Sequence, residues 1–229
     1  MAKKVFLGVG HGGNDPGASK YLVEKDVNLV MAKACRDYLE YNGVSVLMSR
    51  TKDENDPLSE EIKECNAYNP DLAVDIHNNA GGGDGFEAYY YTGGGTSKTL
   101  AFNIEQEVVA IGQNSRGCKT KINSSGKDYY GFIRQIKAPS VIVEGVFVDN
   151  ATDVKIADTE AKQKAFGYAY ARGILKTLQI TPKAMNTSSK ADGTLYKVQV
   201  GAFKNKENAE ELKAKLLKAG FTNAFIKSE

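Results

Sequence analysis

The chain has 229 residues, of which 41% are hydrophobic and 25% are charged, and its 30 basic and 28 acidic side chains leave a net charge of +2. This composition is typical of a globular protein and excludes a disordered chain, and the near balance of charge gives no reason to expect a nucleic-acid partner. The length suits one good-sized core, or one core with a small module.

Apolar runs alternate with helical patterns over residues 1–180 and predict an α/β domain. Three of the five expected strands are nearly all apolar, as in strands that are covered on both faces. The expected strands cover residues 4–9, 44–50, 71–77, 85–91 and 140–147. The expected helices cover residues 26–42, 99–113 and 159–178, and Gly43 stands where the first helix needs a left-handed cap. We therefore expect a mixed, mostly parallel sheet with helices on both faces.

The amino-acid composition changes after Ile180. Residues 181–194 are small and polar with one proline, which is typical of a linker. Residues 195–229 read as a strand, an amphipathic helix and a short strand. The apolar stripe of this helix and the glycine that ends it are Ala209, Leu212, Leu216, Leu217 and Gly220. About 35 residues is small for an independent core, so we expect this β-α-β module either to lack a part or to pair with a second copy.

Three cysteines, Cys35, Cys65 and Cys118, lie far apart without a CxxC pair, so we expect reduced thiols rather than a zinc ribbon or a disulfide framework. The apolar run within residues 1–13 is too short for a secretory signal, and no later run is long enough to span a membrane. We therefore expect synthesis in the cytoplasm, with access to any extracellular target only after lysis or by an unusual exit.

The chain has only two histidines, and both follow expected buried strands. His11 lies within the glycine-rich stretch "GVGHGGNDPGA" after the first strand, and His77 ends the strand over 71–77. Ligand sites of open α/β sheets form at this carboxyl edge, and the glycines allow a sharp turn and a close approach. Glu24 lies just before the first expected helix, near the positive end of its dipole, and Glu144 stands among apolar residues in the last strand.

Two imidazoles and one carboxylate form the ligand set of a hydrolytic zinc centre with a fourth position for water. Zinc lowers the pKa of that water to about 7, and a second carboxylate can take its proton. Burial would raise the pKa of Glu144, which suits a base that passes the proton to a leaving amine. Asp75 shares a strand face with His77 and is an alternative ligand to Glu24, while Glu87 is either structural or substrate-facing.

Other motifs are weaker. The stretch "GGGTSKT" over 93–99 looks like a phosphate-binding loop, but Ser97 stands where that motif needs glycine, so we expect a surface loop. A serine or cysteine nucleophile with His11 or His77 as its base stays an alternative, although the chain has no GxSxG motif. For both His11 and His77, the simplest alternative is a histidine that only makes hydrogen bonds within a loop.

The ordered motifs resemble those of the zinc-dependent N-acetylmuramoyl-L-alanine amidases of type 3, found in bacterial autolysins and phage endolysins, over residues 3–178. "GHGGNDPGA" carries the first zinc ligand of that family onto His11, "EKDVNLVMA" the glutamate ligand onto Glu24, and "DIHNNA" the second histidine onto His77. "RGCK" and "FIRQIKAPSVIVEG" resemble the closing pattern, in which the glutamate is catalytic, here Glu144. The resemblance implies one Zn²⁺ ion and cleavage of peptidoglycan between the lactyl group of N-acetylmuramic acid and the L-alanine of the stem peptide.

The chain departs from this family at two places. Gly8 and Val9 stand where the family usually has Asp-Pro, and Glu61 stands where it often has an arginine in the helix before the second histidine strand. Both departures concern substrate contacts and leave the ligand set intact.

The C-terminal residues 195–229 resemble about one half of a SPOR repeat, a peptidoglycan-binding module, and we expect a truncated repeat or self-association through this segment. Two alternatives stay open for the whole chain: a catalytically inactive wall-binding protein, or a zinc carboxypeptidase or deacetylase acting on the same polymer. The sequence also leaves open whether the chain is a phage endolysin or a host autolysin that lyses the mother cell after sporulation.

Overall fold

The structure is a computed structural model that describes residues 2–183, 200–218 and 224–227. The chain divides into two compact units, Met1–Met185 and Asn186–Glu229. The predicted linker over 181–194 lies mostly outside the described residues, so its boundaries, and those of the predicted domains 1–180 and 195–229, stay predictions.

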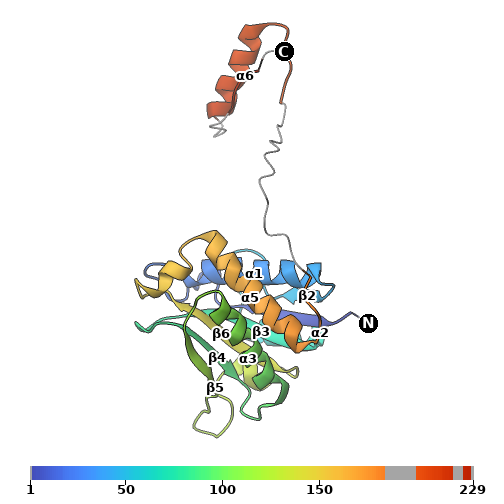
Figure 1. The fold of residues 1–229 in the computed structure, drawn as a ribbon, viewed down its shortest axis with the longest axis vertical. Coiled ribbons are helices and arrows are strands. Elements are labelled where there is room, and N and C mark those ends of the chain that lie inside the picture. Colours follow the sequence, from blue (N-terminus) through green and yellow to red (C-terminus); the bar gives the residue numbers. More distant parts are fainter. Residues whose placement is uncertain (1, 184–199, 219–223, 228–229) are drawn as a thin grey trace. The chain divides into compact units, whose positions relative to one another are not determined.

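The N-terminal unit is built on a six-stranded sheet with the strand order β2-β1-β3-β6-β4-β5 (Figure 1). The strands are β1 (Lys4–Val9), β2 (Ser45–Met48), β3 (Leu72–Asn79), β4 (Phe86–Tyr90), β5 (Ser115–Lys119) and β6 (Ser140–Phe147). Neighbouring strands are parallel except β4 and β6, which are antiparallel. The prediction of a mixed, mostly parallel α/β sheet is confirmed.

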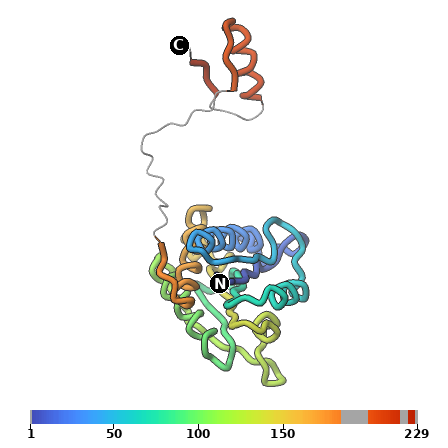
Figure 2. Tube along the Cα trace, turned by 90° about the vertical axis from the view of Figure 1, so that its right-hand side faces the viewer, coloured from blue at the N-terminus to red at the C-terminus, as the bar shows by residue number. Residues whose placement is uncertain are grey.

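Helices cover both faces of this sheet. Three long helices lie on one face, the last of them packed against the other two, and two shorter helices lie on the other face (Figure 2). The first group is α1 (Glu24–Tyr41), α3 (Gly95–Ala110) and α5 (Glu160–Thr177). The second group is α2 (Leu58–Tyr68) and α4 (Gly131–Gln135), and a 3-10 turn, η1 (Asp153–Ile156), follows β6.

The two faces of the sheet differ in chemistry because successive side chains of a strand point to opposite faces. On β3, Val74 and Ile76 are fully buried in the large apolar cluster beneath α1, α3 and α5. Asp75 and His77 alternate with them and therefore face the side of α2 and α4. On that side His77 is paired in register with Glu144 of the neighbouring β6.

The five strands and three long helices expected within residues 1–180 all form, with ends that differ by up to four residues. Gly43 has a φ of +83°, as its predicted left-handed cap requires. The expected surface loop over 93–99 is wrong in part, because α3 already begins at Gly95. Ser97 in its first turn is buried, and its hydroxyl accepts a hydrogen bond from the backbone N–H of Ser140 at 3.2 Å. The sequence patterns do not predict β5 and α4, which have only five residues each.

In the C-terminal unit, α6 (Lys206–Lys218) confirms the expected helix, and none of its residues is buried. The expected first strand, at the start of residues 195–229, lies mostly outside the described residues, and Gly220 lies outside them. The expected final strand does not form in residues 224–227. A short strand is stable only when it pairs with others, and the described part of this unit offers it no partner strand.

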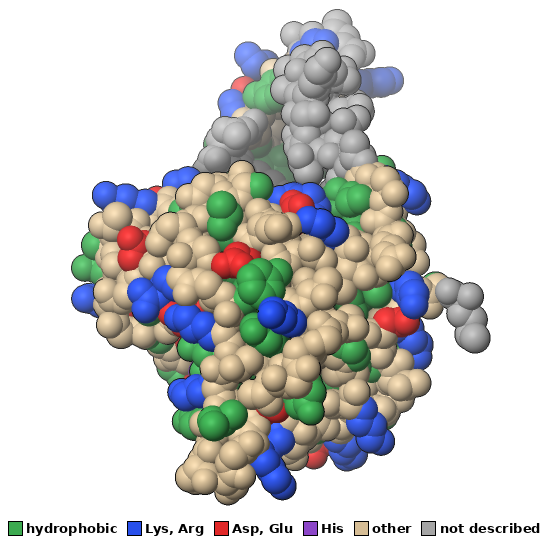
Figure 3. Space-filling view, turned by 60° about the horizontal axis from the view of Figure 1, so that its bottom comes forward, with side chains coloured by type: hydrophobic (Ala, Val, Ile, Leu, Met, Phe, Trp, Pro, Cys, Tyr) green, Lys and Arg blue, Asp and Glu red, His purple; other side chains and the backbone are tan. Residues whose placement is uncertain are grey.

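The distribution of charge on the surface and the state of the cysteines are as the sequence predicts. On the face shown in Figure 3, basic and acidic side chains are dispersed among hydrophobic ones rather than gathered by sign. Cys35, Cys65 and Cys118 are all free, as expected. Among the described residues, no helix combines the length and the apolar character needed to cross a membrane.

Candidate metal centre

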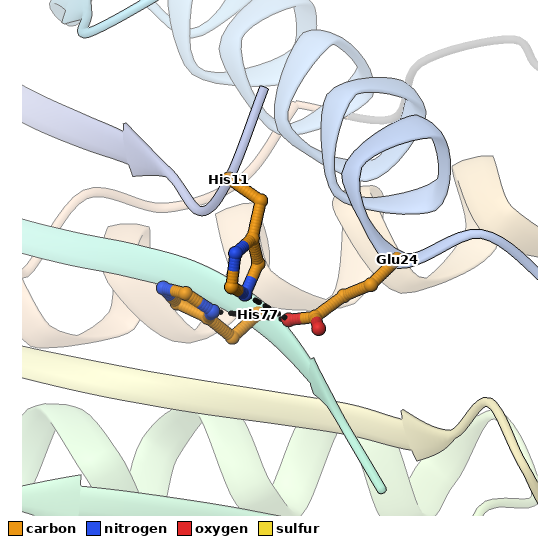
Figure 4. Close-up of side chains that lie close together, drawn as sticks. All are labelled: His11, Glu24 and His77. Atoms are coloured by element: carbon orange, nitrogen blue, oxygen red, sulfur yellow. Dashed lines mark hydrogen bonds and ion pairs between the residues drawn. The ribbon is translucent and has the colours of Figure 1, made fainter. Parts of the chain in front are cut away.

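The three predicted ligands, His11, Glu24 and His77, converge at the carboxyl edge of β1 and β3 (Figure 4). One ligand atom of each lies within 4.8 Å of the other two. Glu24 Oε1 lies 3.2 Å from His11 Nε2 and 3.0 Å from His77 Nδ1. His11 follows β1, His77 lies within β3, and Glu24 is the first residue of α1 rather than the residue before it. Residues far apart in the sequence thus form one cluster of donors.

The glycines around His11 make room for the other two ligands. A Cβ atom on Gly10 would lie 2.1 Å from His77 Cε1, and one on Gly17 would lie 2.5 Å from Glu24 Oε2. His11 itself has a φ of +63°, which a residue other than glycine rarely adopts. The glycines therefore allow the backbone to turn so that the imidazole of His11 comes close to the imidazole of His77 and the carboxylate of Glu24.

A buried arginine holds this loop in place. Arg50 is 2% exposed, and its guanidinium donates to the backbone carbonyls of Gly10 at 3.3 Å and Lys25 at 2.7 Å. A buried charge is tolerated only when it is well hydrogen-bonded, and these bonds tie the end of β1 to the start of α1. Arg50 thus fixes His11 relative to Glu24. Sequence reasoning missed it, although a charged residue that ends an apolar strand was the available signal.

Two buried asparagines extend the network behind the site. Asn28 donates to the carbonyl of Gly10 at 2.9 Å and accepts from Asn78 at 2.7 Å. The backbone N–H of Asn78 donates to Glu24 Oε1 at 3.2 Å, and its side-chain oxygen accepts from the N–H of Val146 at 3.0 Å. These bonds join β1, α1, β3 and β6, and sequence reasoning missed this role of both residues.

The second ring nitrogen of each histidine faces a carboxylate. His11 Nδ1 lies 2.8 Å from Asp15 Oδ2, and His77 Nε2 lies 3.4 Å from Asp75 Oδ2. Such carboxylates orient a ligating imidazole and leave its other nitrogen to face the metal position. Asp75, the alternative ligand, is therefore placed as a partner of His77, outside the group of three converging donors.

The electrostatics of the cluster favour a cation. Burial raises the pKa of Glu24, but hydrogen bonds from both imidazoles outweigh burial and hold it well below its ordinary value. The hydrogen bond to Glu24 raises the pKa of His11. Burial lowers the pKa of His77, but the carboxylates of Asp75 and Glu24 overcome this and raise it well above its ordinary value. Two imidazole nitrogens and one carboxylate oxygen, converging in a field that attracts positive charge, fit the donor set of Zn²⁺.

Glu144 lies beside this cluster. It is paired in register with His77, and both residues line a cavity of about 650 Å³. Burial raises the pKa of Glu144 to about 7, and its Oε2 atom is buried without a hydrogen-bond partner among the described residues. A carboxyl group with a pKa near neutrality can both take and give a proton.

The remaining candidates have other surroundings. Glu87 is paired in register with Glu144, but its carboxylate contacts the Arg116 guanidinium and lies 2.9 Å from Lys119 Nζ, which favours the structural role. Burial raises the pKa of all three cysteine thiols, and none of them lines the cavity. The geometry therefore gives no support to a cysteine nucleophile.

Sequence comparisons match both units. The profile of the family "N-acetylmuramoyl-L-alanine amidase" covers residues 5–176, and that of the SPOR domain covers residues 171–229. The chain is 38% identical to N-acetylmuramoyl-L-alanine amidase CwlM of Bacillus licheniformis, over 95% of this chain and 82% of that protein. It is 36% identical to the sporulation-specific N-acetylmuramoyl-L-alanine amidase of Bacillus subtilis, over 97% and 84%.

Solved structures show the same fold. Cwp6 from Clostridium difficile superposes with a TM-score of 0.76 at 36% identity, over 78% of this chain and 30% of that chain. The catalytic domain of CwlV, an N-acetylmuramoyl-L-alanine amidase from Bacillus (Paenibacillus) polymyxa, superposes with a TM-score of 0.71 at 27% identity, over 78% and 99%.

Proposed function

The chain belongs to the N-acetylmuramoyl-L-alanine amidase family, a family of zinc-dependent cell-wall hydrolases, and from this membership we propose how its own residues perform the reaction. The bond cleaved is the amide between the lactyl group of N-acetylmuramic acid and the L-alanine of the stem peptide. His11, Glu24 and His77 hold one zinc ion, and Glu144 moves the proton. The convergence of three donor atoms within 4.8 Å is the observation that carries this proposal.

Zinc, when bound, supplies a Lewis acid that polarises the scissile carbonyl and makes water more acidic. The protein's part is to present neutral imidazoles and an ionised carboxylate in fixed positions. Asp15 and Asp75 orient the two rings through their second nitrogens. Arg50 holds the loop that carries His11.

Glu144 takes a proton from the attacking water as the new C–O bond forms. It then gives the proton to the nitrogen of L-alanine as the C–N bond breaks, so the products are a free carboxylate on the lactyl group and a free amine on the peptide. A pKa of about 7 suits both transfers, because neither form of the carboxyl group is strongly favoured at neutral pH.

The C-terminal unit contributes binding rather than chemistry in this proposal. Its match to the SPOR domain supports attachment to peptidoglycan through residues 195–229. Self-association through the same residues is a further expectation, which sedimentation of the full chain tests directly. We propose that the protein, made in the cytoplasm, reaches the wall after lysis.

The test is digestion of purified cell walls by the zinc-loaded protein, with and without a chelator, followed by end-group analysis. We expect chelator-sensitive release of L-alanine amino termini without new reducing sugar ends. Release of a D-amino acid would instead indicate a carboxypeptidase, and release of acetate a deacetylase. Binding without any release would indicate a catalytically inactive wall-binding protein.

A further inference from the structure

The cavity beside the metal centre has a one-sided charge. Among the described residues that line it, every side chain with a full charge at neutral pH in water is acidic, and no lysine or arginine is present. The acidic lining residues are Asp15, Asp56, Glu61, Asp75 and Glu144. Asp15, Asp75 and Glu144 already have roles at the metal centre, which leaves Asp56 and Glu61 without an assigned function.

Glu61 of α2 and Asp75 of β3 each place one carboxylate oxygen beside Gly8, at the position that a Cβ atom would otherwise fill. The two side chains belong to residues that are 6% and 4% exposed. A Cβ atom on Gly8 would lie 2.0 Å from Glu61 Oε1 and 2.7 Å from Asp75 Oδ1. Both oxygen atoms are buried and accept no hydrogen bond from the described residues. The glycine at position 8 is what leaves them this space.

Unpaired acceptors of this kind are costly. A buried carboxylate oxygen without a donor has lost its hydration without compensation, and two carboxylates that share a site repel each other. Burial and the charge of Asp75 raise the pKa of Glu61 well above its ordinary value, and burial also raises that of Asp56. A positively charged group in the cavity that these residues line would favour the ionised form of the carboxyl groups and offset their mutual repulsion.

We propose that the acidic group Asp56, Glu61 and Asp75 binds an ammonium group of the substrate. The inference rests on the proposed function, and it names the class of peptidoglycan that the enzyme selects: strands with a free amine near the scissile amide. An ammonium group has three donors that point in different directions, which suits carboxylates from separate elements. The amine belongs either to a diamino acid in the stem peptide or to an amino sugar that lacks its acetyl group.

The test compares soluble substrates that differ in one amine. The first pair are muramoyl tripeptides with lysine or norleucine as the third residue, which have the same chain length with and without the charge. The second pair share norleucine at that position and differ in the sugar amine, which is acetylated or free. Specificity constants are measured for the zinc-loaded full chain as wild type, Glu61→Gln and Glu64→Gln. Glu64 is the matched control, because it lies on the same helix but is exposed and outside the cavity.

For the wild type we expect kcat/KM to favour the amine-bearing member of one pair by about tenfold or more, as for a hydrogen bond to a charged group. Glu61→Gln should reduce this preference to less than about threefold, while Glu64→Gln keeps it. The pair that shows the preference identifies the source of the amine.

Two results would overturn the inference while the amidase activity stands. One is a wild type that hydrolyses both members of each pair equally well, a comparison that needs no variant to fold. The other is a Glu61→Gln protein that is slower on all substrates by one factor, because this outcome assigns Glu61 to the positioning of Asp75 and His77. Absence of hydrolysis of every substrate by the wild type would instead refute the proposed function, and the inference with it.

Discussion

The two faces of the central sheet are built from the same strands but have opposite tasks. Beneath α1, α3 and α5 the strands contribute apolar side chains such as Val74 and Ile76, packed without exposure. On the other face the alternating positions carry Asp75, His77 and Glu144, and two of these have a buried oxygen that finds no hydrogen-bond partner in the described part of the chain. The other face also has an apolar cluster, but a smaller one. The larger cluster thus supplies much of the stability that offsets the unsatisfied polar groups of the other face, which are costly to bury.

The sharpest separation of the two faces comes from Glu144→Gln. This change should lower the rate of amide hydrolysis by about 10²–10⁴-fold, because a positioned acid–base group contributes that much. Zinc content and thermal unfolding should stay close to wild type, since the amide fills the same space. A variant that keeps full activity would contradict the role given to Glu144.

The apolar face is tested by Ile76→Ala. Ile76 is fully buried, and its truncation should lower the free energy of unfolding by about 2–5 kcal/mol, through lost burial and a residual cavity. Activity per folded molecule should change little, because the neighbouring His77 points to the opposite face. Chemical denaturation and an activity assay at low temperature measure the two effects. A large loss of activity in the folded variant would show that packing on the apolar face also controls the geometry of the metal centre.

A smaller effect is expected from Asp15→Asn, which acts on the metal centre from outside the donor set. Asp15 faces His11 Nδ1 at 2.8 Å, and loss of such a carboxylate weakens metal affinity by about 10–100-fold. Competition with a zinc-binding dye measures the change. Unaltered affinity would mean that the loop alone orients the imidazole of His11.

The smallest expected effect is a change in the pH dependence of stability in Glu87→Gln. Burial raises the pKa of Glu87, but contacts with Arg116 and Lys119 outweigh it and hold the pKa below the ordinary 4.5. Ionised Glu87 therefore stabilises the fold above that pH, and the contribution is lost as pH falls through the lowered pKa. The melting temperature of the variant should lie below that of wild type at neutral pH, and the gap should close on acidification. A gap that is independent of pH would contradict this assignment.

The approach of the two histidines could be predicted because the evidence for it is local, whereas the choice of Glu24 over Asp75 rested on the resemblance to the amidases. Only two histidines exist, both follow apolar strands, and alternation along a strand tells which neighbours share a face with His77. The strand and helix ends are less certain, and short elements such as β5 and α4 are missed because five residues carry little periodicity.

The supporting network could not be predicted in the same way. Arg50, Asn28 and Asn78 act through backbone carbonyls and N–H groups that come close only when the sheet has formed. A buried polar side chain gives no periodic signal of which distant groups it will meet. The departure at Glu61 was visible in the sequence, but its meaning depends on Gly8 and Asp75, which lie on two other elements.

The register of β3 against β6 sets the distance between two residues of the proposed reaction. It sets His77 opposite Glu144 on neighbouring parallel strands, whose backbones lie about 4.8 Å apart. The spacing between a proposed metal ligand and the proposed proton carrier is therefore fixed by a backbone ladder in the middle of the sheet. The connecting segments over 51–57 and 120–130 are not held by this strand pairing. The first of them carries Asp56, which lines the cavity beside the metal centre. Such connecting segments can therefore differ between relatives without changing the spacing between His77 and Glu144.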